Sequence, residues 1–388
     1  MLQALRDFKI GRPQILAGAM LLVFLAQGLW VASNRKLTAL EYQYISSGFP
    51  QKPGQEYRVT SPMTGIVAAF PVRMVLLLNG PAGVKTGTAY WAIPRPWLFR
   101  LPFLIFGAWL GGALWWVARR LFDDVGGYMA LALYCSSPAV IMISSNIGPE
   151  IILAWSSFGL IYTAIGVAHT LYAPVRKWIP RTIILGLSIG FAVATAAWSF
   201  TLVLLVLGFM MYLAPGRRKA AVTVLACASA LGLMVAAVIM WMVGSHGLLA
   251  ASLLTPHPGA DWPARLGHAL AFAFVDGYSN VNSYLFVLLF IAALTAYASW
   301  KRARYFGNTF PLVAAFSVVA VFSLIPALHL WEASLGLSFV FLFIGGVASD
   351  VVESVPGIWL SSILTAGFGV RAVLGLMALG RWIHVNAR

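Results

Sequence analysis

Acidic residues are scarce in this sequence. Of 388 residues only 11 are Asp or Glu, and charged residues of both signs make up 10% of the chain, whereas soluble domains carry about 25%. So few polar groups do not cover the surface of a globule in water. The scarcity therefore excludes a water-soluble fold.

Disulfide and zinc-binding patterns are also missing. Cys135 and Cys227 both lie inside apolar segments, so no disulfide framework is expected. No two histidines have the His-x-x-x-His spacing of a zinc site. Glycine-rich phosphate loops are absent as well, because the glycine pairs at 111–112 and 126–127 fall at helix-packing positions inside apolar segments.

Apolar residues, by contrast, make up 61% of the chain. Read as segments of roughly 20 residues, they predict an all-α, polytopic transmembrane bundle of about eleven spans, forming one membrane domain over residues 1–388. The first span, Ile15 to Ser33, follows a basic stretch and is too long for the core of a cleavable signal. We expect it to remain as a signal-anchor helix.

Two polar segments interrupt the apolar pattern. The first, residues 34–96, is rich in tyrosine, so order is a better interpretation of it than disorder. Inside it, Gly65 to Leu78 is apolar but too short to cross a bilayer, which predicts a short interfacial helix. The second segment spans residues 245–280 and contains the turn Pro256-His257-Pro258.

The net charge of +15 does not indicate a nucleic-acid partner, because the cations come in short clusters between apolar segments. Such clusters set topology and meet anionic headgroups of membrane lipids. They fall on alternate connections, which predicts a multi-pass protein of a cell's inner membrane, with a cytoplasmic N-terminus and both polar segments facing outward. Asp350 and Glu353 would then be cytoplasmic, so the rule leaves the orientation of the last two spans open. The clusters are Arg6/Lys9/Arg12, Arg119/Arg120, Arg176/Lys177/Arg181, Arg217/Arg218/Lys219 and Lys301/Arg302/Arg304.

Two of the outward carboxylates stand at the edge of a span. Glu41 follows the first span by a few residues, and Glu150 opens a later one in the sequence Gly148-Pro149-Glu150. Carboxylates at membrane depth are costly and so point to function. A pair of them suits a general base with an electrostatic or metal-binding partner in group transfer. The structural alternative for Glu150 is an acid that stabilises a helix N-terminus.

Four basic residues lie in or next to the first polar segment. Arg58, Lys85, Arg95 and Arg100 are candidates for binding a phosphate or pyrophosphate through charge-assisted hydrogen bonds. The alternative for each of them is anchoring to lipid headgroups.

The order of these features resembles the membrane glycosyltransferases of the GT-C class, in particular the protein O-mannosyltransferase and aminoarabinose transferase branch, the GT39 family. The likeness covers roughly residues 1–215. It rests on the first helix, on the outward acid followed by tyrosines, and on three motifs: Ser61-Pro62-Met63-Thr64-Gly65, Arg100-Leu101-Pro102 with Ala118-Arg119-Arg120-Leu121-Phe122, and Cys135-Ser136-Ser137-Pro138 ahead of Glu150.

The resemblance implies roles for the two acids. Glu41 takes the place of the general base, and Glu150 that of a second acid linked to acceptor binding or to a divalent metal ion, the one cofactor it implies. The donor would be a polyprenyl-phosphate sugar, with Arg58, Lys85 and Arg95 near its phosphate. The family usually has Asp at both acid positions, and displacement of a catalytic group by about 1 Å can cost a hundredfold in rate.

Three functions are therefore compared. The first is transfer of a sugar from a polyprenyl-phosphate donor to an acceptor on the outer side of the membrane. The second is a catalytically inactive integral subunit that keeps the architecture for assembly with other membrane subunits or for lipid binding. A transporter is the third, and the absence of two halves with matching broken helices argues against it.

Overall fold

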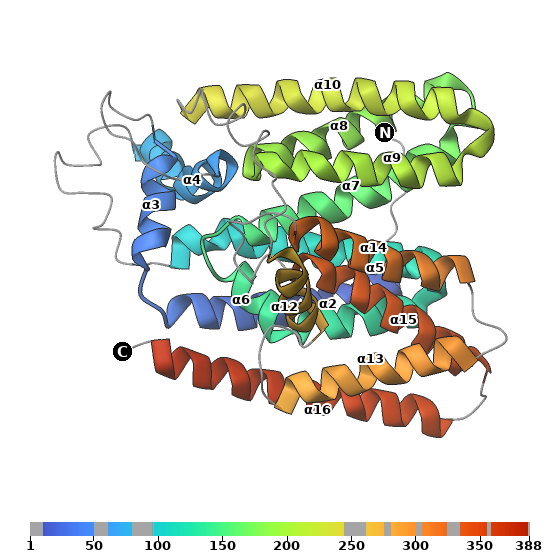
Figure 1. Cartoon of the computed structure of the whole chain (residues 1–388). Coiled ribbons are helices and arrows are strands. Elements are labelled where there is room, and N and C mark those ends of the chain that lie inside the picture. Colours follow the sequence, from blue (N-terminus) through green and yellow to red (C-terminus); the bar gives the residue numbers. More distant parts are fainter. Residues whose placement is uncertain are drawn as a thin grey trace.

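Long helices that run side by side make up most of the molecule (Figure 1). The structure, a computed structural model, describes residues 11–49, 61–79, 95, 97–243, 261–274, 281–299, 305–323, 334–354 and 358–386. These ranges contain helices and their connections and no strand, which confirms the all-α prediction. The α-helices are α2 (Arg12–Ser33), α3 (Ala39–Ser47), α4 (Pro62–Asn79), α5 (Trp97–Cys135), α6 (Pro138–Ser144), α7 (Glu150–Thr170), α8 (Trp178–Thr195), α9 (Leu202–Leu213), α10 (Arg218–Val243), α12 (Trp262–Phe274), α13 (Val281–Ser299), α14 (Tyr305–Ser323), α15 (Leu337–Ser354) and α16 (Ile358–Asn386).

Seven helical segments among the described residues are long and apolar enough to cross a membrane. They are Pro13–Ser33, Trp97–Cys135, Glu150–Thr170, Val175–Thr195, Pro215–Val243, Ser334–Ser354 and Ala366–His384. Three shorter apolar segments, Ala197–Leu213, Ser283–Ser299 and Thr309–Val321, accompany them. The polytopic helical architecture is as expected, while the number of about eleven crossings stays a prediction.

Helix α5 is two helices joined at a sharp kink. Phe122 and Asp123 leave the helical conformation, and Asp123 has a φ of 62°, which is uncommon for a residue other than glycine. The chain doubles back there, because the Tyr134 hydroxyl donates a hydrogen bond to the carbonyl oxygen of Gly107 at 2.6 Å. A side chain at Gly111 would strike the Tyr134 ring, so small residues let the two arms approach closely.

Helix α15 forms the centre of the bundle. Every residue from Leu337 to Phe343 is buried, and α15 packs against α5 and α14. Helix α10 lies at the outside and exposes apolar side chains such as Met234 and Trp241. In a polytopic membrane protein such residues are expected to face lipid, whereas a helix that is buried on all sides belongs to the interior.

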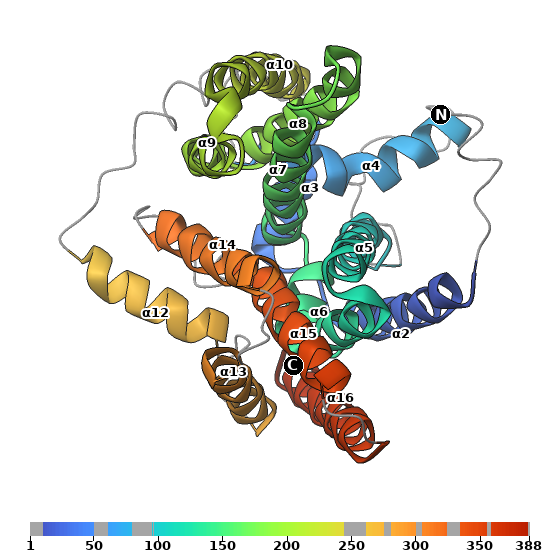
Figure 2. The same ribbon diagram turned by 90° about the vertical axis from the view of Figure 1, so that its right-hand side faces the viewer.

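The first polar segment contains the two helices α3 and α4. Helix α4 covers the apolar stretch that the sequence assigned to a short helix. It is seen nearly end-on in Figure 1 and lengthwise in Figure 2, so it crosses the long helices rather than joining their bundle. Its position along a membrane surface stays a prediction, as does the outward placement of residues 34–96. The second segment, residues 245–280, contains α12.

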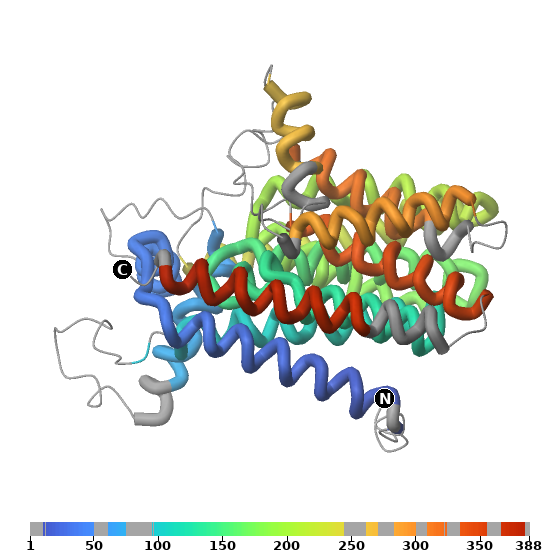
Figure 3. The backbone as a smooth tube through the Cα atoms, turned by 90° about the horizontal axis from the view of Figure 1, so that it is seen from below, coloured from blue at the N-terminus to red at the C-terminus, as the bar shows by residue number. Residues whose placement is uncertain are grey.

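The two ends of the bundle differ in character. Helix α3 lies at one end, and the basic turns Val175–Lys177 and Pro215–Arg217 lie at the opposite end (Figure 1). Helix α16 contacts α2, and its C-terminal end lies at the same end of the bundle as α3 (Figures 1 and 3). The fold therefore gathers the ends of α2 and α16, helix α3 and the start of α7 on the side away from these basic turns.

Candidate functional site

Glu41 is positioned by the first turn of its own helix. Thr38 is the N-cap of α3, and its hydroxyl accepts a hydrogen bond from the Glu41 amide at 3.2 Å. In return the Thr38 amide donates to Glu41 Oε2 at 2.8 Å. This reciprocal capping box satisfies two backbone donors that the helix itself leaves open. It also turns the carboxylate back toward the start of the helix.

Arg100 meets that carboxylate from α5. Its Nε donates to Glu41 Oε1 at 2.9 Å and its Nη2 to Glu41 Oε2 at 2.7 Å, a bidentate ion pair. Both side chains are buried, Arg100 at 0% exposure and Glu41 at 3%. The other three N–H groups of Arg100 donate to backbone carbonyl oxygens at the end of α2, namely those of Ala32, Arg35 and Lys36. All five guanidinium donors are therefore used within the chain.

A fourth donor reaches Glu41 from the connection between α6 and α7. The Ile147 amide donates to Glu41 Oε1 at 3.1 Å. Each carboxylate oxygen thus accepts two hydrogen bonds, which fills its two lone-pair positions. Burial raises the pKa of the Glu41 carboxyl, but the hydrogen bond and charge of Arg100, with the amides of Thr38 and Ile147, outweigh burial and leave the pKa below its ordinary value.

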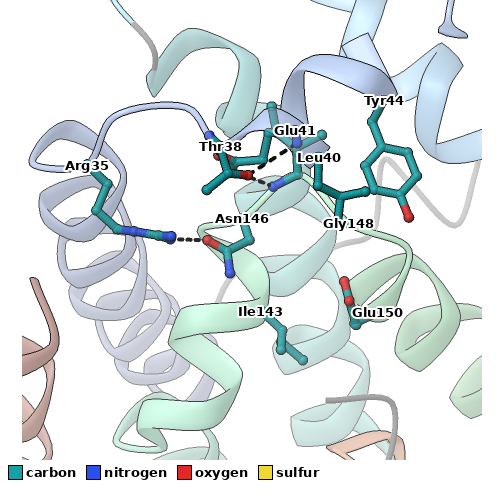
Figure 4. A pocket seen from close by; sticks show the side chains of 10 residues that line it. Arg35, Thr38, Leu40, Glu41, Tyr44, Ile143, Asn146, Gly148 and Glu150 are labelled. Carbon is teal, nitrogen blue, oxygen red and sulfur yellow. Dashed lines mark hydrogen bonds between the residues drawn. The ribbon is translucent and has the colours of Figure 1, made fainter. Parts of the chain in front are cut away.

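A cavity of about 180 Å³ lies beside this ion pair. It is open on one side, and Figure 4 shows the side chains that line it. It brings Glu41 and Glu150 together at one site, as expected if both belong to one functional centre. The residues that line the cavity are Arg35, Thr38, Leu40, Glu41, Tyr44, Ile143, Asn146, Ile147, Gly148 and Glu150.

Glu150 presents a carboxylate of a different kind. It is the first residue of α7, where the helix dipole favours a negative charge. Within the described part of the chain its carboxylate forms no ion pair. The carboxylate lies against Gly148, and a Cβ atom at that position would collide with Glu150 Oε2. Glu41 is thus held by four donors, whereas Glu150 faces the cavity without a cationic partner.

Arg35 is a cavity residue that the sequence reasoning missed. Its Nη1 donates a hydrogen bond to Asn146 Oδ1, and its guanidinium carbon lies 4.0 Å from the centre of the Trp382 ring on α16. Its position in the sequence, directly after the first span and six residues before Glu41, could have identified Arg35 as a candidate site residue. Nothing in the sequence indicates that Asn146 and Trp382 lie beside it.

The structure describes two of the four basic residues that the sequence put forward for phosphate, Arg95 and Arg100. Arg100 is committed to Glu41 and to carbonyl oxygens, so it has no N–H group left for a phosphate in this arrangement. Arg95 is exposed just ahead of α5. Arg58 and Lys85 lie outside the described residues. Phosphate binding by Arg58, Lys85 and Arg95 stays a prediction.

The cavity residues do not fit a divalent metal ion. In the ranges that the structure describes, no group of three or more His, Cys, Asp or Glu side chains comes together. The other carboxylate beside Glu150 is Glu41, whose oxygen atoms already accept four hydrogen bonds. We therefore assign Glu150 no metal ion in the steps below.

The fold is similar to that of ArnT, as comparison with solved structures shows. Two crystal structures of ArnT from Cupriavidus metallidurans are similar to the chain, each with a TM-score of 0.60 over 96% of it. The one bound to undecaprenyl phosphate is 12% identical, with 76% of its chain covered, and the apo structure is 14% identical, with 74% covered. No protein-family model matches the sequence, and no curated protein is similar to it in sequence. The similarity to ArnT supports the fold that the resemblance implies, and membership of the GT39 family stays a prediction.

Proposed function

We propose that this protein is a membrane glycosyltransferase that moves a sugar from a polyprenyl-phosphate donor to an acceptor on the outer side of a cell's inner membrane. The observation that carries the proposal is a cavity in which Glu150, whose carboxylate forms no ion pair with any residue that the structure describes, lies beside the ion-paired Glu41. The fold supports it, because ArnT has been crystallised with undecaprenyl phosphate bound. The cavity is lined by residues of α3 and of the connection before α7, and α3 lies at the opposite end of the bundle from the basic turns (Figure 1). The positive-inside rule places those turns in the cytoplasm.

The chemistry needs one group that accepts a proton. An acceptor hydroxyl oxygen forms a bond to the anomeric carbon of the sugar, and the bond from that carbon to the phosphate oxygen breaks. The leaving oxygen keeps the electron pair, and the proton of the hydroxyl passes to a carboxylate. A general base needs an open lone pair within hydrogen-bonding reach of that proton.

Glu150 meets this requirement better than Glu41. In the arrangement described above, Glu41 would have to lose a hydrogen bond before it took a proton. We assign proton transfer to Glu150 and a positioning role to Glu41. The contact from Glu41 to the Ile147 amide holds the connection that leads to Glu150, and it sets where the free carboxylate lies. The role of Glu41 as general base, implied by the resemblance, remains the competing assignment.

A transfer assay with purified protein in detergent tests the proposal. Undecaprenyl-phosphate-linked hexoses and pentoses would be supplied as a panel, and release of undecaprenyl phosphate would be measured. Glu150→Gln should lower the rate by roughly 10²–10⁴-fold, as expected for loss of a general base. Turnover at the wild-type rate in a folded Glu150→Gln variant would remove Glu150 from the mechanism.

One observation favours the inactive-subunit alternative. Glu41, which takes the place of the family's general base, accepts four hydrogen bonds from within the chain. A carboxylate with this role in the structure needs no catalytic function to account for it. That alternative predicts co-purification with other membrane subunits in fixed stoichiometry and no release of undecaprenyl phosphate from any donor in the panel.

A further inference from the structure

We propose that Arg35 is the residue that binds the phosphate ester of the lipid donor in this cavity, and that Asn146 and Trp382 hold it in place. The inference rests on the proposed function, because that function supplies the phosphate. Ten of the residues that the structure describes line the cavity, and Arg35 is the basic one among them. Arg100, which donates a hydrogen bond to the Arg35 carbonyl oxygen, has all five donors engaged within the chain.

The Arg35 side chain is fixed by two contacts of different kinds. Asn146 accepts a hydrogen bond from Nη1, and the Trp382 ring lies against the guanidinium carbon at 4.0 Å. A cation–π contact uses the flat face of the guanidinium rather than its N–H donors. Arg35 is 8% exposed. Its attraction for a negative charge is therefore stronger than in water, because the surroundings are partly desolvated. Arg35 is thus positioned before any ligand arrives.

The cavity has a cationic side and an anionic side. Figure 4 shows Arg35 entering from the end of α2 and Glu150 from the start of α7, with Asn146 between them. A sugar held in the cavity would therefore have the Arg35 cation on one side and the Glu150 carboxylate on the other. In a displacement the leaving phosphate and the attacking hydroxyl lie on opposite faces of the anomeric carbon. This polarity suits a phosphate at Arg35 and an acceptor hydroxyl at Glu150.

The charge that develops in the reaction also favours this assignment. The donor is a phosphate diester with one negative charge. The released lipid phosphate is a monoester with a second ionisation near pH 6, so negative charge builds on the phosphate as its bond to the sugar breaks. A preorganised cation at that position stabilises the transition state more than the ground state.

The size of the cavity sets which part of the donor enters. A volume of about 180 Å³ is roughly six times the share of one water molecule in the liquid. A cavity of this size with one open side suits a head group better than a long polyprenyl chain. The chain would stay outside, in the lipid, while the phosphate reaches Arg35 at the end of the first span.

Binding of undecaprenyl phosphate, measured without any transfer step, tests the inference. The probe would be titrated into purified protein in a nonionic detergent, and inorganic phosphate would be titrated separately. Arg35→Gln should weaken binding of the lipid phosphate roughly tenfold to a hundredfold, as expected for loss of a charge-assisted contact. Arg176→Gln makes the same change of charge at an exposed position in a basic turn at the other end of the bundle, and should leave the affinity unchanged.

The two titrations distinguish the sources of the phosphate. Weaker binding of the lipid probe alone in Arg35→Gln identifies a lipid ester as the ligand. Weaker binding of inorganic phosphate as well identifies a site for phosphate in general. Unchanged affinity for both probes overturns the inference. If Arg35→Gln does not fold, then Arg35→Lys and Trp382→Leu, which loosen the position of the cation, should each weaken binding, and wild-type affinity in both would overturn the inference equally.

The binding and transfer experiments together distinguish failure of the Arg35 inference from failure of the proposed transferase function. Glu150→Gln should lose transfer and keep its affinity for undecaprenyl phosphate. If no donor in the panel supports transfer but Arg35→Gln still weakens binding, the phosphate site stands and the transferase assignment fails. If the wild-type protein transfers sugar and Arg35→Gln binds and transfers as the wild type does, the transferase stands and Arg35 has no part in it.

Discussion

Arg100 and Glu41 form a buried bidentate ion pair in which neither side chain has a hydrogen-bonding position left for a third group. The pair links the end of α2, the first turn of α3, the start of α5 and the connection before α7. Three parts of the chain that are distant in sequence, residues 32–41, the start of α5 and the connection before α7, therefore meet at one carboxylate. The cavity with Glu150 lies next to this junction, so its shape depends on the pair.

The first prediction concerns the stability of this junction. Glu41→Gln leaves the Arg100 guanidinium buried beside a neutral group, and breaking a buried ion pair in this way costs about 3–5 kcal/mol. We expect a clear fall in Tm of the purified protein in detergent. Arg119→Gln, which breaks the exposed pair with Asp124, should lower Tm little, because such pairs contribute about 0–1 kcal/mol. A Glu41→Gln variant that unfolds like the wild type yet has lost transfer would instead make Glu41 the general base.

The second prediction is the pH dependence that follows from the lowered pKa of Glu41. In the unfolded chain this carboxyl titrates near pH 4.3, and in the folded protein it titrates at a lower pH. The ion pair therefore contributes in full above the unfolded value, and its contribution is lost as the pH falls through the folded value. The difference in unfolding free energy between wild type and Glu41→Gln should be constant near neutral pH and shrink on acidification. A difference that grew toward acid pH would contradict the assignment.

The third prediction isolates the position of the Glu150 carboxylate. Gly148→Ala places a Cβ atom where Glu150 Oε2 now lies, and the flexible carboxylate must move. We expect a loss of transfer of up to about a hundredfold, the cost of a displacement near 1 Å, with little change in Tm. Gly18→Ala is the matched control, because a Cβ there meets open space. Full activity in Gly148→Ala would show that the present position of the carboxylate is not needed.

The helices and the pair of acids could be predicted from the sequence, and their neighbours could not. Apolar runs mark the spans because side chains surrounded by hydrocarbon must be apolar, and the runs are helical because a helix satisfies its own backbone in lipid. Glu41 and Glu150 stand out because carboxylates are rare in this chain. The pairing of Arg100 with Glu41 could not be predicted, because it depends on how α3 and α5 pack against each other in the folded protein. Arg35, Asn146 and Trp382 come from three distant segments, and no periodicity relates them.

The last prediction concerns the close approach of α3 and α4, which supports the same end of the bundle. Gly48 ends α3 with a φ of −75°, a value that alanine adopts readily, so glycine is not needed there for its backbone. It is needed for space, because a Cβ atom at position 48 would strike the carbonyl oxygen of Gly65 on α4. A backbone atom cannot turn aside as a flexible side chain does, and α4 would have to shift as a whole. Gly48→Ala should therefore lower the free energy of unfolding by about 1–3 kcal/mol, the usual cost of overpacking. Gly208→Ala on α9, where a Cβ meets open space, is the control, and equal Tm values for the two variants would show that α3 and α4 are not held this closely together.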